Sequence, residues 1–319
     1  MQYYREQTQW LKIQAFLPEE YRLTQGNLPE EHFFSWGDCE IHLDCYRPKY
    51  PKATVVLLHG VGGHGRLLSF LALPLYRSGF EVICPDLPLY GNTAISGTVL
   101  YADWVKCAAD LVCGYQERGP VFLMGLSAGG MLAYQAAAQC KGVKGVIATC
   151  LLDQRIPLVT NKTAANPLLA KIGGPCLAPM SRWFPRLKLP MKWLVNMRAI
   201  ANNPALVQEL LRDKRASGTR VTLEFVDSLL HPEMKIEPQD FLSCPVLLLH
   251  PQKDKWTELE LSLLFFDRLA GSKTIKVLEN AGHFPIEQPG IAQIENYTIE
   301  FMSAILRVEP DGRQETANE

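Results

Sequence analysis

Uninterrupted apolar runs alternate with helical patterns in the first half of the chain, and this alternation limits the folds available to it. The runs carry Val, Ile and Leu at successive positions, which is typical of strands whose two faces are both buried in a parallel sheet. They are ATVVLLHG (53–60), FEVICPD (80–86), PVFLMG (120–125) and VKGVIATCLL (143–152). Helical patterns separate them, at 67–79, 101–119 and 128–140. Short connections of this kind predict an α/β fold with right-handed crossovers and helices covering the sheet.

The alternation stops at Asp153 and resumes at about residue 241. The second half then has two apolar runs and two helical patterns, at 244–250, 256–271, 273–279 and 289–306. Between the halves, residues 154–240 are rich in Pro, Trp, Met and Leu and contain no clear strand, so we interpret them as an insertion. Ahead of the first buried run, HFFSWG and EIHLDCYRP flank a turn at Gly37-Asp38 and predict a β-hairpin.

Charge and hydropathy narrow the class of protein. Lys and Arg number 32 against 33 Asp and Glu in 319 residues, so we expect no nucleic-acid partner. The N-terminal MQYYREQTQWLKIQAF lacks the apolar core of a signal peptide, and no stretch approaches 18 uninterrupted apolar residues. With 47% apolar residues the chain can bury a large core, and we expect a cytoplasmic globular protein whose oligomeric state is left open.

The cysteines do not form a recognisable framework. There are nine, an odd number, without a CxxC pair, and several lie inside apolar runs. We therefore expect reduced, mostly buried thiols rather than disulfides or a metal site at positions 39, 45, 84, 107, 113, 140, 150, 176 and 244.

The pentapeptide GLSAG (125–129) joins the buried run PVFLMG directly to a helical pattern. A serine on so sharp a turn is a candidate nucleophile, because its hydroxyl is exposed beside the N-terminus of the helix. Large side chains at the flanking positions would collide with the strand or the helix, and Gly125, Ala128 and Gly129 avoid this. The alternative is that Ser127 only caps the helix.

A serine nucleophile needs a base and an orienting acid, and loops after the late strands offer both. His283 follows the last apolar run in LENAGHFPIEQP, at the sheet edge where we expect Ser127. Asp254 follows the preceding run in LLLHPQKDKW and would hold the imidazole in the required tautomer. Asp153, in CLLDQ, is the rival acid. We favour Asp254, because Ser, Asp and His then follow one another in the expected order.

The loop HGVGGHG (59–65) follows the first buried run and can supply an oxyanion hole. Its glycines let the backbone approach a substrate closely. We expect the amides of Val61 and Ala128 to be the two donors, and Gly60 and Leu126 beside them to contact substrate. His59 and His64 lack a third ligand at a suitable spacing, so we expect no metal or other cofactor, and we expect His59 to brace the loop.

Five segments, HGVGG, CPDLPLYGNT, GLSAG, HPQKD and AGHFPIEQP, occur in an order that resembles the α/β-hydrolase superfamily. The resemblance covers residues 33–153 and 241–306. It implies an eight-stranded, mostly parallel sheet flanked by helices, with Ser127, Asp254 and His283 as a triad. It also implies an α/β-hydrolase core at 32–153 and 241–308 and a helical cap at 154–240. A polar N-terminal arm, 1–31, precedes the core, and a polar tail, 309–319, follows it. DLPLYGNT departs from the frequent Asp-x-x-Gly-x-Gly-x-Ser of the family.

The predicted cap has an unusual composition. Residues 154–208 contain no Asp or Glu but eight Lys and Arg, and large apolar residues lie between them, among them Trp183 and Trp193. Three interpretations stay open: a roof whose apolar side, including these two tryptophans, contacts substrate; a surface that contacts anionic lipid; or a surface for a protein partner.

These features together predict a serine hydrolase that cleaves carboxylic esters with an apolar acyl or alkyl chain through an acyl-enzyme. A lactonase, for example for acyl-homoserine lactones, and a monoacylglycerol lipase are compatible alternatives. A non-catalytic ligand-binding protein on a hydrolase scaffold is the alternative of another class.

Overall fold

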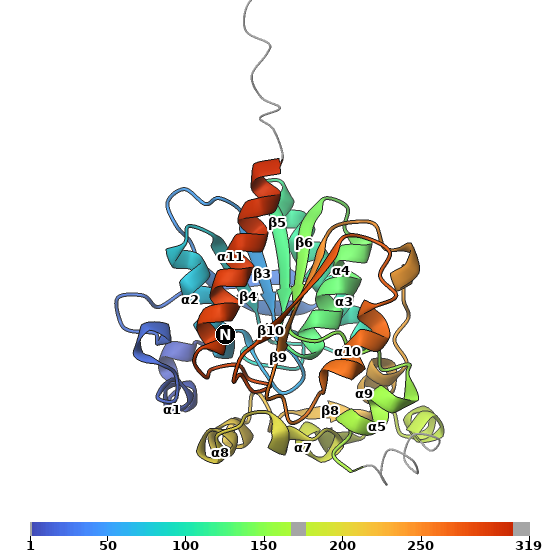
Figure 1. Ribbon diagram of the computed structural model, residues 1–319. Coiled ribbons are helices and arrows are strands. Elements are labelled where there is room, and N and C mark those ends of the chain that lie inside the picture. The colour runs from blue at the N-terminus through green and yellow to red at the C-terminus, as the bar shows by residue number, and fades with distance from the viewer. Residues whose placement is uncertain (1, 167–176, 309–319) are drawn as a thin grey trace, which may run out of the picture.

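One eight-stranded sheet forms the centre of the computed structural model, which describes residues 2–166 and 177–308 (Figure 1). Its strands are β1 (Glu30–Trp36), β2 (Cys39–Tyr46), β3 (Thr54–Leu58), β4 (Glu81–Pro85), β5 (Val121–Gly125), β6 (Val143–Ala148), β9 (Val246–Pro251) and β10 (Lys273–Leu278). Their order is β1-β2-β4-β3-β5-β6-β9-β10. Only β2 runs antiparallel to its neighbours, β1 and β4. The predicted mostly parallel sheet and the predicted hairpin are both confirmed.

Helices cover the two faces of this sheet (Figure 1). One face carries α2 (Ser69–Arg77) and α11 (Gly290–Val308), and the other carries α3 (Tyr101–Gln116), α4 (Ala128–Gln139) and α10 (Leu259–Phe266). All five residues of β3 are buried, and its four apolar residues alternate between two hydrophobic clusters: Val56 and Leu58 belong to one, Val55 and Leu57 to the other. This two-sided burial explains the uninterrupted apolar runs in the sequence.

The segment between β6 and β9 lies across the end of the sheet at which the parallel strands finish (Figure 1). It contains α5 (Pro157–Thr163), β7 (Lys188–Pro190), α7 (Met191–Leu194), α8 (Pro204–Arg212), β8 (Arg220–Thr222) and α9 (Leu223–Leu230). The expectation of no strand between 154 and 240 is wrong, since β7 and β8 pair as a small antiparallel sheet. Strands of three residues are too short to produce a period in the sequence.

The N-terminal arm packs against the core through its few apolar residues. Tyr4, Trp10 and Leu17 are buried, and α1 (Gln9–Gln14) contacts α8. The predicted polar tail, 309–319, lies outside the described residues. The described residues also form five short 3-10 helices: η1 (Tyr4–Glu6), η2 (Glu19–Tyr21), η3 (Gly65–Leu68), η4 (Met197–Ala199) and η5 (Pro238–Asp240).

The expectation that all the thiols are reduced is wrong for one pair. Cys113 in α3 and Cys140 after α4 form a disulfide, with their Cα atoms 6.4 Å apart. The packing of α3 beside α4 brings together two residues 27 positions apart, which their spacing in the sequence does not reveal. Cys176 lies outside the described residues, and the remaining cysteines are free and buried, at positions 39, 45, 84, 107, 150 and 244.

Candidate active site

The turn between β5 and α4 holds Ser127 in a strained conformation. Its φ of 57° lies in the left-handed region, which L-residues rarely adopt. The backbone is as crowded here as the sequence predicts. A Cβ added at Gly125 would lie 1.9 Å from the carbonyl oxygen of Gly129, and one added at Gly129 would lie 2.3 Å from that of Leu58. Glycine at these positions is what permits the turn to present the serine hydroxyl.

A chain of hydrogen bonds joins three side chains from three different loops. The Nε2 atom of His283 lies 2.8 Å from Oγ of Ser127, and its Nδ1 atom lies 2.7 Å from Oδ2 of Asp254. Because the carboxylate accepts from Nδ1–H, Nε2 is left as the acceptor for the serine proton. The side chains of Asp254 and His283 are 1% and 4% exposed, so water hardly competes for these bonds.

The loop after β9 keeps Asp254 ionised and fixed. Its Oδ1 atom accepts the amides of Trp256 and Thr257 at 2.8 and 2.9 Å, and Oδ2 also accepts the hydroxyl of Thr257 at 2.7 Å. Burial raises the pKa of this carboxyl, but His283 and these hydrogen bonds outweigh burial and hold the pKa below its usual range. Thr257 is not among the site residues predicted from the sequence, although its place three residues after the candidate acid is a signal for a hydroxyl of this kind.

The rival acid, Asp153, has a different partner. Its carboxylate accepts hydrogen bonds from the guanidinium of Arg155, the shortest at 2.8 and 2.9 Å, and Arg155 also pairs with Glu237 at 2.6 Å. The structure therefore brings Asp254, and not Asp153, to His283.

The loop that follows β3 passes directly over Ser127. A Cβ added at Gly60 would lie 2.9 Å from the Cβ atom of Ser127 and 3.0 Å from the amide nitrogen of Ala128. Ala128 is the first residue of α4, a position where an amide has no acceptor within the helix. Val61 and Ala128 line the same cavity as Ser127, which is where two oxyanion donors are predicted from the sequence.

Asp86 and Leu87, the two residues that follow β4, hold the two ends of this loop. At the first end, the buried ring of His59 donates from Nδ1 to the carbonyl of Gly60 at 2.8 Å and accepts the amide of Leu87 on Nε2 at 3.0 Å. Burial lowers the pKa of His59 to about 4, so the ring stays neutral. At the other end, the amide of Gly65 donates to Asp86 at 2.7 Å. This confirms the predicted bracing role of His59.

A buried ionic cluster fixes Asp86 in turn. The hydroxyl of Tyr4 donates to its Oδ2 atom at 2.8 Å, and Nδ1 of His42 lies 3.1 Å from the same oxygen. Burial lowers the pKa of His42, but Asp86 and Glu31 outweigh burial and raise it to about 10. Glu31, His42 and Asp44 together have the composition of a metal site, but a bidentate ion pair from Arg66 already neutralises Asp44.

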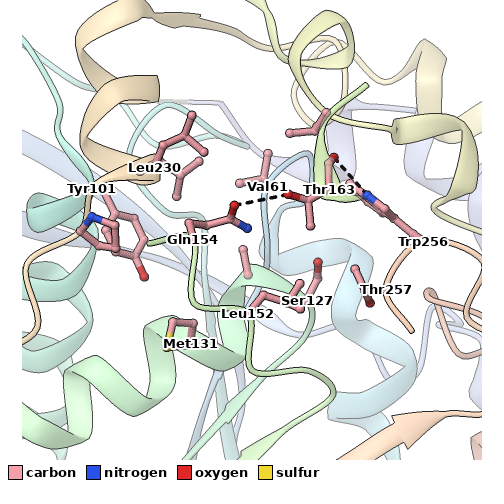
Figure 2. A pocket seen from close by; sticks show the side chains of 14 residues that line it. Val61, Tyr101, Ser127, Met131, Leu152, Gln154, Thr163, Leu230, Trp256 and Thr257 are labelled. Atoms are coloured by element: carbon pink, nitrogen blue, oxygen red, sulfur yellow. Dashed lines mark hydrogen bonds between the residues drawn. The ribbon is translucent and has the colours of Figure 1, made fainter. Parts of the chain in front are cut away.

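An apolar cavity of about 70 Å³ opens beside Ser127 (Figure 2). Besides the serine, its wall consists of Val61, Tyr101, Ala128, Met131, Leu152, Gln154, Thr163, Val195, Leu229, Leu230, Pro232, Trp256 and Thr257. A smaller hollow, of about 30 Å³, is also lined by Ser127 and includes Gly60, Leu126 and His283 in its lining. The structure thus places Gly60 and Leu126, as the sequence predicts, next to the serine.

The two tryptophans chosen from the sequence as substrate contacts do not line these cavities. Trp183 is 79% exposed and Trp193 is 62% exposed, so both indoles point away from the serine. The assignment is wrong because composition shows that a segment is apolar but does not show which side chains point inward. Trp256, two residues after Asp254, supplies the aromatic wall instead (Figure 2).

Comparison with known proteins agrees with this geometry. Residues 49–288 match the family model Hydrolase_4, described as serine aminopeptidase, S33, and this match spans most of the chain. The chain therefore belongs to this family of α/β hydrolases, and the resemblance noted from the sequence is confirmed.

Individual relatives are distant. An uncharacterized abhydrolase domain-containing protein of Dictyostelium discoideum is 25% identical over 76% of this chain and 25% of its own length. The chain spans only 4% to 25% of the curated relatives that it matches. Among solved structures, a monoglyceride lipase from Saccharomyces cerevisiae has a TM-score of 0.71 at 17% identity, covering 91% of this chain and 97% of that one. A monoacylglycerol lipase from Paleococcus ferrophilus has a TM-score of 0.62 at 21% identity, covering 83% and 99%. These likenesses establish the α/β-hydrolase fold.

Proposed function

We propose that this chain is a serine hydrolase that cleaves carboxylic esters with an apolar acyl or alkyl chain. The observation that carries the proposal is the hydrogen-bonded chain from Asp254 through His283 to Ser127, which ends at the wall of an apolar cavity. In this proposal Ser127 is the nucleophile, His283 the general base and Asp254 the acid that orients it.

The reaction then proceeds in two halves. Oγ of Ser127 attacks the ester carbonyl carbon while Nε2 of His283 takes the hydroxyl proton, and the oxyanion accepts hydrogen bonds from the amides of Val61 and Ala128. Collapse of this intermediate breaks the ester bond, and His283 returns the proton to the departing alcohol. A water molecule, deprotonated by His283, attacks the acyl-enzyme, releases the carboxylic acid and restores the serine.

The cavity favours an ester over the N-terminus of a peptide, although the family is described as aminopeptidases. Recognition of a substrate ammonium calls for a carboxylate nearby, because a buried charge needs a partner. Among the described residues that line the cavity with Ser127, none is acidic. Lactones and monoacylglycerols also suit this apolar wall. Monoacylglycerols should be tested first, because two structural neighbours are named as lipases of this substrate.

The decisive experiment combines labelling with turnover. We expect a fluorophosphonate probe to label the native protein, and we expect the protein to hydrolyse p-nitrophenyl butyrate. A panel of monoacylglycerols and acyl-homoserine lactones is then tested for turnover. A folded protein that neither reacts with the probe nor hydrolyses any of these compounds would be a binding protein on a hydrolase scaffold instead.

We also propose that the protein makes peripheral contact with anionic membranes through exposed side chains of the insertion. Three large aromatic side chains are exposed there: Trp183 (79%), Phe184 (62%) and Trp193 (62%). Exposed cations lie among them, at Arg182, Arg186, Lys188 and Lys192. Aromatic rings beside cations suit an interface of anionic headgroups and acyl chains. No helix of the described residues is both long enough and apolar enough to span a bilayer. The cytoplasmic location stays a prediction.

Vesicle binding tests this contact. We expect the protein to co-sediment with phosphatidylcholine vesicles that contain phosphatidylglycerol, less so as salt is added, and the double substitution Trp183→Ala with Trp193→Ala to weaken binding about tenfold. Tyr50→Ala is the control, because Tyr50 is 80% exposed and lies outside the insertion. The membrane contact would be ruled out if the tryptophan double variant and Tyr50→Ala sedimented equally, or if the wild-type protein did not sediment with the vesicles.

A further inference from the structure

We infer that a second cavity, within the insertion, binds the distal part of an unbranched acyl chain whose ester group lies at Ser127. This inference rests on the proposed esterase function and adds the chemical class of the acyl group. The cavity has a volume of about 200 Å³, nearly three times that beside Ser127. Side chains from α5, β7, α7 and α9 surround it, together with Leu177 and Met180.

The second cavity adjoins the first. Four residues line both cavities: Thr163, Val195, Leu229 and Leu230. Thr163 and Leu230 are seen in Figure 2 at the side of the first cavity that lies toward the insertion. A chain that leaves the ester carbonyl at Ser127 and passes these four side chains therefore enters the second cavity.

The wall of the second cavity offers contacts only to an apolar ligand. Eleven of its thirteen described lining residues are Ala, Val, Leu or Met, and none carries a charge. The other two are threonines whose hydroxyls are already used: Thr160 donates to the carbonyl of Gln154 at 2.6 Å, and Thr163 donates to that of Val159 at 3.0 Å. A polar group placed here would lose its hydrogen bonds to water without replacement, whereas methylene groups would gain burial.

The volumes set the length of the chain. A cavity of about 150 Å³ lined by Leu, Ile and Phe in another protein accepts benzene, which has six carbons. In proportion, the second cavity has room for about eight carbons and the first for about three. We therefore expect kcat/KM to rise with acyl length about fourfold for each methylene that is buried, up to roughly ten carbons, and to fall beyond that length.

Val226 provides the test, because this buried residue of α9 lines the second cavity and not the first. Val226→Phe fills space, and we expect it to lower the ratio of kcat/KM for p-nitrophenyl decanoate to that for the butyrate at least tenfold. Val226→Ala adds space for about two carbons, and we expect it to move the optimum toward dodecanoate. Val207→Phe is the matched control, since this residue of α8 is equally buried in the insertion but lines neither cavity.

The inference is supported if the preferred acyl length falls in Val226→Phe and rises in Val226→Ala, while the decanoate-to-butyrate ratio is unchanged in Val207→Phe. A general packing defect would instead change the preferred length in the same direction in both Val226 variants. If Val226→Phe does not fold, as judged by thermal melting, the shift in Val226→Ala decides the matter. Hydrolysis of butyrate with a profile that falls from four carbons, or with equal ratios in all variants, overturns the acyl site but leaves the esterase in place. Absence of any ester hydrolysis by the wild type overturns the esterase itself.

Discussion

Replacing Ser127 by alanine should lower kcat for p-nitrophenyl butyrate at least a thousandfold and abolish labelling by a fluorophosphonate. The hydroxyl is the atom that would form the acyl-enzyme, and no other group takes its place at 2.8 Å from Nε2 of His283. The loss of one hydroxyl leaves the glycines that shape the turn unchanged, so the melting temperature should change little. Steady-state kinetics and thermal melting on the same preparation measure both expectations.

Ser303→Ala, on α11, serves as the matched control, because it also removes one hydroxyl but far from the turn. It should retain the wild-type rate and the label. If Ser127→Ala kept more than about a thousandth of the wild-type kcat, another side chain would be the nucleophile, and the assignment of the whole site would have to be given up.

Asp254→Asn should lower kcat by roughly four orders of magnitude with little change in KM. Asparagine is almost the same size, but its amide group can donate to Nδ1 of His283, which favours the tautomer with the proton on Nε2. That nitrogen then cannot accept the proton of Ser127. The comparison of kcat and KM for the same ester in both proteins measures the effect.

Asp153→Asn is the control that the sequence itself suggests. Because Asp153 binds Arg155 and not His283, we expect a loss in kcat of less than about tenfold, through weaker packing of the loop after β6. A larger loss in Asp153→Asn than in Asp254→Asn would reverse the assignment of the acid.

The sequence predicts those parts of the fold in which a single local constraint, such as burial or backbone crowding, determines the residue type. Strands buried on both faces, such as β3 and β5, are apolar at nearly every position, so they stand out as continuous runs. The turn at Ser127 can also be predicted from the sequence, because close backbone contacts require glycine at positions 125 and 129. His283 and Asp254 were found through their places in loops at one edge of the sheet, where the structure brings them together.

The features that the sequence does not reveal depend on distant contacts. Which aromatic residues of the insertion face inward depends on how short elements such as β7 and α7 pack, so the sequence does not show that Trp183 and Trp193 point outward. It also does not show that Trp256, in the loop after β9, lines the cavity instead. The disulfide between Cys113 and Cys140 likewise depends on the packing of α3 against α4. Neither case leaves a local pattern.

The anchoring of Tyr4 bears on how the protein should be handled in the laboratory. Its ring stacks on His64 and its hydroxyl reaches Asp86, so a purification tag fused just ahead of it would begin beside the residues that hold the loop over Ser127. The last described turn of α11, by contrast, is exposed and lies at the end of the molecule away from the insertion (Figure 1). A tag added after α11 is the arrangement that leaves the proposed active site undisturbed, and rates measured with a tag at the other end should be compared with those after its removal.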